Sequence, residues 1–201
     1  MRFLLNARRD VELVNFEKLT YAGNPESLSD VAPDPRYHFI RGDITDRSAV
    51  AELFRRGFDA AIHFAAETHV DRSIEDPVPF LETNIFGTQH LLEAARAFPN
   101  IRFIHISTDE VYGSAPAGIA FREETPLDPR SPYAASKASA EHFVTAYANT
   151  YGISSVILRC TNNFGPRQFP EKLIPLMIAN ASENKPFRFM GMACRSATGC
   201  S

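Results

Sequence analysis

The sequence predicts an α/β protein with a doubly wound parallel sheet. Short runs of β-branched and aromatic residues, bounded by turn residues, recur along the chain with helical patterns between them. Strands are expected at residues 11–15, 37–41, 60–65, 101–107 and 155–159, and helices at 47–56, 80–98 and 133–151. This alternation is typical of a parallel sheet with helices on both faces. Because ligands of such sheets bind beyond the carboxyl ends of the strands, the residues after each strand are the candidate site residues.

Start signals support the three helices, since Asp46 precedes the first, Pro79 the second and Ser131 with Pro132 the third. The Asn-Phe-Gly-Pro sequence at 163–166 marks a change of domain. We therefore expect one domain over 1–165 and the beginning of a second over 166–201. The sequence shows no internal repeat and no low-complexity segment.

Composition narrows the function classes. A formal net charge of -3 argues against binding to nucleic acid or an anionic membrane through bulk electrostatics, so small molecules are the expected partners. No apolar run approaches the roughly 18 to 20 residues of a membrane-spanning helix, and a cytoplasmic location is expected. The three cysteines, Cys160, Cys194 and Cys200, and the six scattered histidines lack the spacing of a disulfide framework or a metal site, so no metal is expected.

Candidate cofactor residues follow the early strands. Glu17 follows the strand at 11–15, which we interpret as the second strand of a dinucleotide-binding sheet, where an acidic side chain accepts hydrogen bonds from the adenosine ribose. A solvated surface glutamate is the alternative. Asp43 either bonds an adenine amino group or caps a turn. The small residues in Phe64-Ala65-Ala66-Glu67-Thr68 let a backbone approach a cofactor closely, although alanine pairs also serve packing.

Two further groups suit acid–base chemistry. The strand at 101–107 leads directly into Thr108-Asp109-Glu110, and adjacent carboxylates there suit general acid and base roles, although they could simply be exposed turn residues. Tyr133 and Lys137 stand four apart on a predicted helix, so both project from one face. A nearby ammonium group lowers a tyrosine pKa from about 10 toward neutrality, which would make Tyr133 a usable base.

A series of motifs carries a resemblance to a known family. The motifs, in chain order, are FEKLTYAGN, RGDITD, FAAETHVDRSI, ETNIFGTQHLLEAA, STDEVYG, SPYAASKASAEHFV and RCTNNFGPRQFPEKLIP. Together they resemble nucleotide-sugar enzymes of the extended short-chain dehydrogenase/reductase family, specifically dTDP-glucose 4,6-dehydratases, over about residues 10 to 187. Tyr-x-x-x-Lys is shared across the superfamily, whereas Thr-Asp-Glu before Val-Tyr-Gly distinguishes these dehydratases from 4-epimerases and related decarboxylases.

The resemblance implies a Rossmann-like NAD-binding domain over 1–165 and the start of a substrate-binding domain with an aberrant tail over 166–201. It implies NAD contacts at Glu17, Lys18, Leu19, Thr20, Asp43, Ile44, Phe64, Ala65, Ala66, Glu67, Thr68, Thr83, Tyr133, Lys137 and Asn163. It implies nucleotide-sugar contacts at Thr68, Thr108, Asn162, Lys172 and Leu173, and catalytic roles for Thr108, Asp109, Glu110, Tyr133 and Lys137. The family has Asp where Glu17 stands, so weakened ribose binding is expected.

The implied reaction converts dTDP-glucose to dTDP-4-keto-6-deoxyglucose. Tyr133 takes the proton of the C4 hydroxyl while hydride passes from C4 to NAD. The resulting ketone acidifies the C5 hydrogen, which Glu110 removes while Asp109 protonates the departing C6 hydroxyl. The hydride then returns to C6, so NAD is recycled and the net reaction is a dehydration. A homodimer paired through the helices at 80–98 and 133–151 is also implied.

The sequence departs from the family at both ends. It has no Gly-x-x-Gly-x-x-Gly turn, and MRFLLNARRD resembles the later part of the helix that would follow such a turn. We expect the first strand and the phosphate loop to be cut off, with Met1 an internal or mis-assigned start. The tail from Met190 to Ser201 loses the resemblance, which suggests a frameshift or premature stop. Loss of a central strand costs free energy comparable to a whole stability of about 5 to 15 kcal/mol.

Two other readings stay open. The first is another nucleotide-sugar enzyme, a UDP-sugar 4,6-dehydratase or a 4-epimerase, which competition between dTDP- and UDP-glucose would distinguish. The second is a non-catalytic fragment that at most dimerises, which NAD binding by the 201-residue chain would count against.

Overall fold

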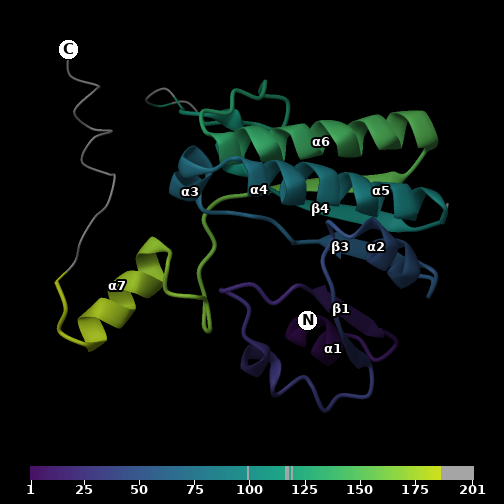
Figure 1. Ribbon diagram of the computed structural model, residues 1–201, viewed down its shortest axis with the longest axis horizontal. Coiled ribbons are helices and arrows are strands. Elements are labelled where there is room, and N and C mark those ends of the chain that lie inside the picture. Colours follow the sequence, from purple (N-terminus) through teal and green to yellow (C-terminus); the bar gives the residue numbers. More distant parts are fainter. Residues whose placement is uncertain (99, 116–117, 119, 187–201) are drawn as a thin grey trace. The chain divides into compact units, whose positions relative to one another are not determined.

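The computed structural model describes residues 1–98, 100–115, 118 and 120–186 (Figure 1). The chain divides into two compact units, Met1–Thr161 and Asn162–Ser201. The sequence predicted a boundary after residue 165, and the first unit ends at Thr161. The tail from Met190 to Ser201, with Cys194 and Cys200, lies outside the described residues.

All the strands of the first unit pair in parallel. They are β1 (Leu13–Glu17), β2 (Tyr37–Arg41), β3 (Ala60–His63), β4 (Arg102–Thr108) and β5 (Ser154–Cys160). They form two sheets with the orders β1-β2 and β3-β4-β5, and within the described residues no strand joins the two. The predicted α/β class with parallel strands is confirmed, and each predicted strand is present with ends that shift by up to two residues.

The helices of the described residues outnumber those that the sequence pattern predicted. They are α1 (Arg2–Ala7), α2 (Arg47–Phe54), α3 (Val70–Glu75), α4 (Val78–Phe80), α5 (Thr88–Arg96), α6 (Pro132–Tyr151) and α7 (Leu173–Ser182). Two 3-10 turns, η1 (Pro25–Leu28) and η3 (Asp109–Tyr112), and a π-helix, η2 (Leu81–Gly87), complete the set. The predicted helix at 80–98 is therefore three consecutive pieces, α4, η2 and α5.

The long helix α6 has clear local signals at both ends. Ser131 caps its start, because the Ser131 hydroxyl accepts a hydrogen bond from the Ala134 amide at 3.1 Å, and Pro132 occupies the first turn. Gly152 ends it in the left-handed conformation, with φ of 73°. These signals fix the register of the helix, and hence the positions of Tyr133 and Lys137.

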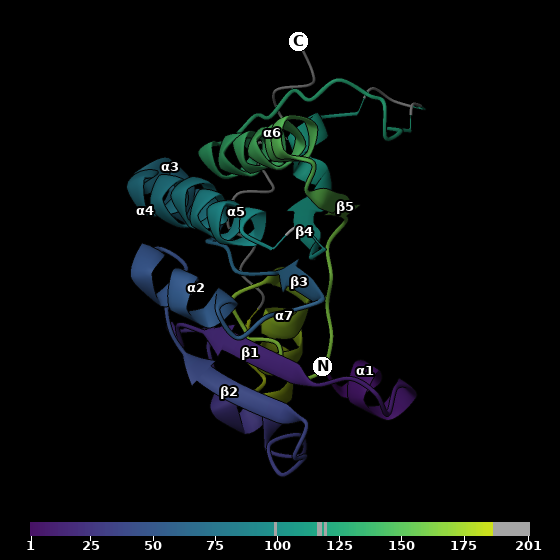
Figure 2. The ribbon, with the colours of Figure 1, turned by 90° about the vertical axis from the view of Figure 1, so that its right-hand side faces the viewer.

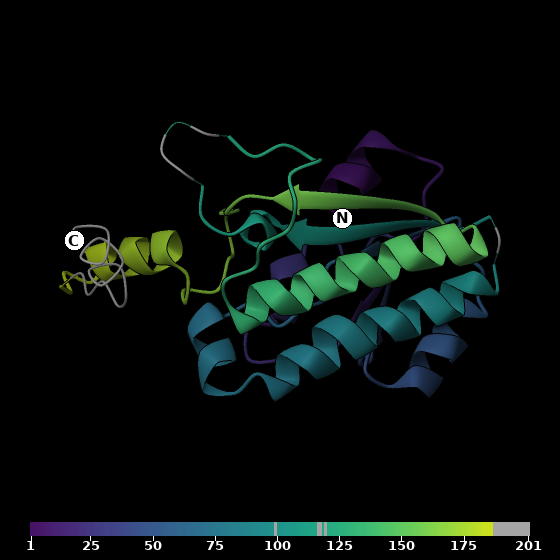
Figure 3. The ribbon, with the colours of Figure 1, turned by 90° about the horizontal axis from the view of Figure 1, so that it is seen from above.

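Three helices cover one face of the β3-β4-β5 sheet. In Figures 2 and 3, α2, α5 and α6 lie side by side over these strands. The core between the two layers contains Leu92, Phe103 and Val144, each with 0% of its surface exposed. On the strands, Ile62 and Leu158 remain 44% exposed, so burial of apolar surface is concentrated under the helices.

Gly87, at the end of η2, permits a close approach between η2 and the loop after β2. A Cβ atom at this position would lie 2.5 Å from Cδ1 of Ile44. The absence of that atom lets Ile44 pack to 6% exposure against the helix layer. No helix among the described residues combines the length and apolar character that a membrane span requires.

Candidate active site

The carboxyl end of β4 carries the two adjacent acids. Thr108 is the last residue of the strand, and its hydroxyl caps η3 by accepting a hydrogen bond from the Glu110 amide at 3.3 Å. Asp109 is half-buried and Glu110 is exposed, whereas Val111 and Tyr112 anchor the turn in a small core with Ala138 of α6. The acids therefore lie on a short turn whose base is buried.

Tyr133 and Lys137 lie on the first turns of α6, and both are buried, with 8% and 4% of their surfaces exposed. The Tyr133 amide donates to the Ser73 hydroxyl at 3.1 Å, and the Lys137 ammonium donates to the carbonyl oxygen of Ile106 on β4 at 2.8 Å. Both residues thus lie on one face of the helix, as their four-residue spacing predicted, and that face is buried.

The phenol of Tyr133 lies close to the turn that carries Asp109 and Glu110. The pKa of Tyr133 is raised to about 12, mainly by burial. A hydrogen bond with the Thr108 side chain opposes this shift, and the charges of Glu110 and Asp109 add to it. The structure therefore brings Tyr133 together with all three residues of the Thr-Asp-Glu sequence. The expectation that Lys137 moves the Tyr133 pKa toward neutrality is wrong in this arrangement, because burial and the two carboxylates dominate.

Lys137 lies over a buried pair of histidines. Burial lowers the pKa of Lys137 to about 8, and the charge of Glu141 opposes that shift. The rings of His63 on β3 and His105 on β4 lie 5.2 Å apart, and each has a lowered pKa because of burial and the nearby Lys137 charge. Burial at this part of the site therefore favours the neutral forms of these three side chains.

The expected adenosine residues gather at the carboxyl ends of β1 and β2. One oxygen of Glu17 accepts a hydrogen bond from the Leu19 amide at 2.9 Å, and Leu19 has a positive φ of 58°. Asp43 pairs with the ammonium of Lys18 at 2.6 Å and accepts a hydrogen bond from the Thr45 amide at 2.9 Å. Asp43 therefore caps a turn, one of its two expected roles. Thr20 is exposed and Ile44 is buried.

The segment after β3 is held by a residue that sequence reasoning missed. Phe64 is 71% exposed, Ala65 and Thr68 are exposed, and Ala66 and Thr83 are half-buried. The buried Asn84 amide accepts from the Glu67 amide at 2.8 Å, donates to the Glu67 carbonyl at 3.0 Å and donates to the Ser136 hydroxyl at 2.8 Å. A polar Asn within the largely apolar Asn-Ile-Phe-Gly run was the available signal.

The remaining predicted residues belong to the second unit and are described by themselves. Asn162 and Asn163 are exposed, and the Gln168 side chain donates to the Asn163 carbonyl at 3.3 Å. Lys172 precedes α7, and Leu173 is its first residue, 45% exposed. Their roles toward a nucleotide sugar stay predictions.

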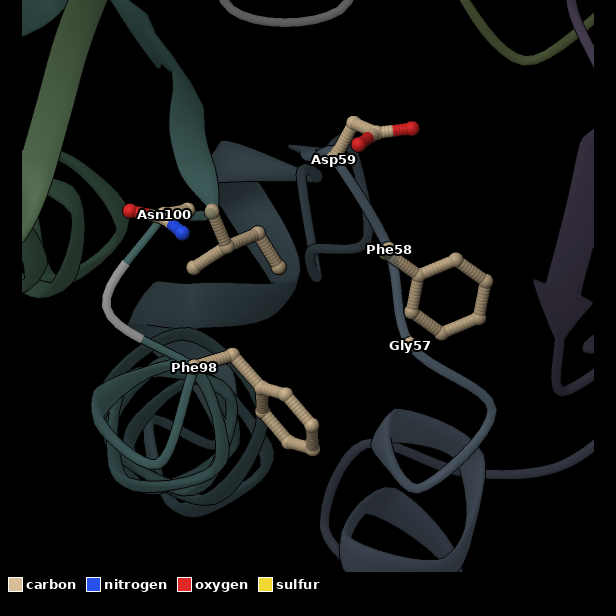
Figure 4. Close-up of a pocket in the computed structure, with 6 residues that line it drawn as sticks. Gly57, Phe58, Asp59, Phe98 and Asn100 are labelled. Carbon is tan, nitrogen blue, oxygen red and sulfur yellow. The ribbon is translucent and has the colours of Figure 1, made fainter.

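A cavity of about 300 Å³ lies at the opposite ends of the strands (Figure 4). Gly57, Phe58, Asp59, Phe98, Asn100 and Ile101 line it. These residues immediately precede β3 and β4, whereas Thr108 ends β4. Because ligands of parallel sheets bind at the carboxyl ends, this cavity is not part of the candidate active site.

The model of the GDP-mannose 4,6 dehydratase family matches residues 1–193. The chain belongs to this family. Among individual members, it is 51% identical over 202 residues to dTDP-glucose 4,6-dehydratase from Neisseria gonorrhoeae, covering 95% of this chain and 58% of that relative. The predicted resemblance to dTDP-glucose 4,6-dehydratases is confirmed. The chain spans somewhat more than half the length of the curated relatives that it matches.

Solved structures of other proteins share the fold. A double mutant of the dTDP-glucose 4,6-dehydratase from Streptomyces venezuelae, with NAD bound, aligns with a TM-score of 0.87 and 47% identity over 94% of this chain and 60% of that chain. A UDP-glucuronic acid 4-epimerase from Bacillus cereus, also in complex with NAD, aligns with a TM-score of 0.81 and 30% identity over 92% of this chain and 59% of that one. The higher identity lies on the dehydratase side.

Proposed function

We propose that the protein is a dTDP-glucose 4,6-dehydratase, a hydro-lyase that forms dTDP-4-keto-6-deoxyglucose with internally recycled NAD. The observation that carries the proposal is the meeting of Tyr133 on α6 with the Thr108-Asp109-Glu110 turn after β4. A base for a hydroxyl proton and two carboxylates at one end of a sheet is the set of groups that water elimination from a sugar requires. The similarity to curated dehydratases supports the same substrate class.

The residues present fit parts of NAD. The Glu17 carboxylate, at the end of β1, can accept hydrogen bonds from adenosine ribose hydroxyls. The Lys137 ammonium has three donors, one of which binds the Ile106 carbonyl, so it can also donate to the hydroxyls of the nicotinamide ribose. The exposed Ala65 leaves backbone accessible after β3. The further proposed contacts are those that the resemblance assigns, including Lys18, Leu19 and Thr83.

When bound, NAD supplies the acceptor of the C4 hydride and the donor of the same hydride to C6. The chain's own residues move the protons. Tyr133 takes the proton of the C4 hydroxyl, with the Thr108 hydroxyl bonded to its phenol. Glu110, the more exposed acid, removes the C5 proton, exchanges it with solvent and later protonates C5. Asp109 protonates the C6 hydroxyl, which leaves as water, and the proton gained by Tyr133 replaces the one that Asp109 gave.

The test is product formation from dTDP-glucose and NAD, followed by mass spectrometry in heavy water. A dehydratase product has lost one water and carries solvent deuterium at C5. We expect Glu110→Gln to lower turnover by about 10² to 10⁴ fold. Glu124→Gln, on the exposed loop after η3, is the matched control and keeps full turnover. Unaltered protein that binds NAD and dTDP-glucose without forming this product would refute the proposal.

A second candidate is a nucleotide-sugar 4-epimerase, which the TM-score of 0.81 to such an enzyme favours. An epimerase leaves the mass of the sugar unchanged and has no need of an acid pair. Asp109→Asn would then leave turnover intact, whereas a dehydratase would lose it. Competition between dTDP- and UDP-glucose in the same assay identifies the nucleotide.

We further propose that the protein pairs with a second copy through α5 and α6 and the adjoining η2. Phe86 and Phe143, on η2 and α6, are 58% and 39% exposed, and a second copy seated on these helices would cover them. Sedimentation of the unaltered chain and of Phe86→Glu tests this. Identical monomeric sedimentation of both would contradict the pairing.

A further inference from the structure

A buried ion pair joins α6 to β5. The Glu141 side chain is 2% exposed, and the Arg159 guanidinium donates to both of its carboxylate oxygens, at 3.2 Å and 3.0 Å from Nε and 2.7 Å from Nη2. A buried carboxylate is costly unless such bonds satisfy it. Neither residue is among those proposed to contact NAD or the sugar.

The other edge of the same guanidinium binds the turn that carries Asp109 and Glu110. Nη1 of Arg159 donates to the Tyr112 hydroxyl at 2.6 Å and to the Glu123 carbonyl at 3.0 Å. The guanidinium carbon also lies 4.9 Å from the centre of the Tyr112 ring, and that ring stacks on Phe121 at 5.0 Å. Tyr112 is the last residue of η3, the turn that presents Asp109 and Glu110.

The two anchor points of this guanidinium are the two halves of the candidate active site. Glu141 lies one helical turn beyond Lys137 and two beyond Tyr133 on α6. Arg159 is planar and rigid, so its fork sets the distance and the angle between the residues at its two edges. A lysine at this position could still pair with Glu141, but it could not hold both edges.

We propose that Glu141, Arg159 and Tyr112 are positioning residues, which fix the turn carrying Asp109 and Glu110 against the face of α6 carrying Tyr133 and Lys137. The catalytic consequence rests on the proposed dehydratase function. In that reaction the acids must reach C5 and C6 of a sugar whose C4 hydroxyl contacts Tyr133. A displacement of about 1 Å between such groups can lower the rate roughly a hundredfold.

Two variants keep the buried packing while breaking the connection. Tyr112→Phe retains the stacked ring and removes the hydroxyl that accepts from Arg159. Arg159→Lys retains the positive charge beside Glu141 and removes the fork. Tyr147→Phe is the control, because Tyr147 is as buried as Tyr112 and its hydroxyl donates to Glu93, on α5 and remote from the turn.

The first measurement is amide hydrogen exchange over the turn, which requires no activity. The Gly113 amide donates to the Glu110 carbonyl at 3.1 Å, so it reports whether the turn is closed. We expect about tenfold faster exchange in Tyr112→Phe and Arg159→Lys, the effect of one lost hydrogen bond, and no change in Tyr147→Phe. Exchange that stays as slow in both variants as in the unaltered protein overturns the inference.

The second measurement is the division between kcat and KM for dTDP-glucose. We expect kcat to fall at least about tenfold in both variants while KM stays within about twofold, since a positioning residue acts on the reacting geometry. An unchanged kcat in an active protein overturns the inference. If the unaltered protein forms no product, that result counts against the proposed function alone, and the exchange of the turn decides the inference.

Discussion

Acid conditions should destabilise this fold through one pair of side chains, His63 and His105. Their exposed fractions are 5% and 0%, the His63 ring contacts the Thr88 hydroxyl at 2.9 Å, and both ring nitrogens of His105 lack a hydrogen-bond partner among the described residues. Burial, followed by the charge of Lys137, lowers the pKa of His63 to about 3 and that of His105 to about 2. Both imidazoles are therefore neutral in the folded protein.

The sign and size of the effect follow from proton linkage. Below the ordinary histidine pKa of 6.5, the unfolded chain binds protons that the folded protein does not, so stability falls as the pH falls toward the lowered values. Each histidine costs about 1.4 kcal/mol per pH unit in that range, so the pair removes about 4 kcal/mol between about pH 8 and about pH 5. That loss is a large fraction of the total stability of a typical domain.

Urea unfolding at a series of pH values, followed by circular dichroism, measures this loss. His105→Leu removes one titrating ring and two unpaired buried nitrogens, so it should halve the loss to about 2 kcal/mol and raise the stability at about pH 8. His142→Leu, an exposed position on α6, is the control and should keep the full loss. A His105→Leu variant as acid-sensitive as the unaltered protein would refute the reasoning.

Three other outcomes are expected. The Tyr133 pKa is raised from 10.0 to about 12, so as the pH rises this phenol loses its proton in the unfolded chain first, and the free energy of unfolding falls by about 2.7 kcal/mol across that interval. Tyr133→Phe should abolish this fall in alkaline urea titrations. Leu92→Ala, at a fully buried position, should cost about 2 to 5 kcal/mol in the same assay, with exposed Leu81→Ala as its control. Asp46→Ala removes the cap that accepts from Ser48 and Ala49 amides and should cost about 1 kcal/mol, and Asp46→Asn much less.

The sequence was most informative where local chemistry decides the structure. The strand Tyr37–Arg41 has the predicted ends, and α6 begins within one residue of its prediction because Ser131, Pro132 and Gly152 are local signals. The π-helix η2 was not predicted, since the sequence pattern at 80–98 fits an ordinary helix throughout. The helices α3, which is polar, and α7, which contains a proline, were not predicted because their sequences lack a clear helical period.

The candidate site likewise has features that the sequence predicted and features that it did not. That Thr108, Asp109 and Glu110 follow a strand and that Tyr133 and Lys137 share a helix face could be predicted from spacing alone. Their pKa values could not, because these depend on burial and on neighbours distant in sequence. Asn84 and Arg159 were missed for that reason, since their partners Glu67, Ser136 and Glu141 come from other elements.

Burial of the site residues disfavours their charged forms, and neighbouring polar groups oppose this effect. Burial raises the pKa of Tyr133 and lowers that of Lys137, so the ionised phenol and the ammonium are both disfavoured. The Thr108 hydroxyl opposes the first shift and the Glu141 carboxylate the second. With a pKa of about 8, Lys137 keeps its proton in most molecules at neutral pH, whereas Tyr133 does not ionise. The proposed role of Tyr133 as a base therefore requires a further positive charge, which the oxidised nicotinamide ring of NAD would supply. Added NAD should accordingly lower the Tyr133 pKa in an ultraviolet titration, and an unchanged titration with NAD bound would show that the phenol is not the base.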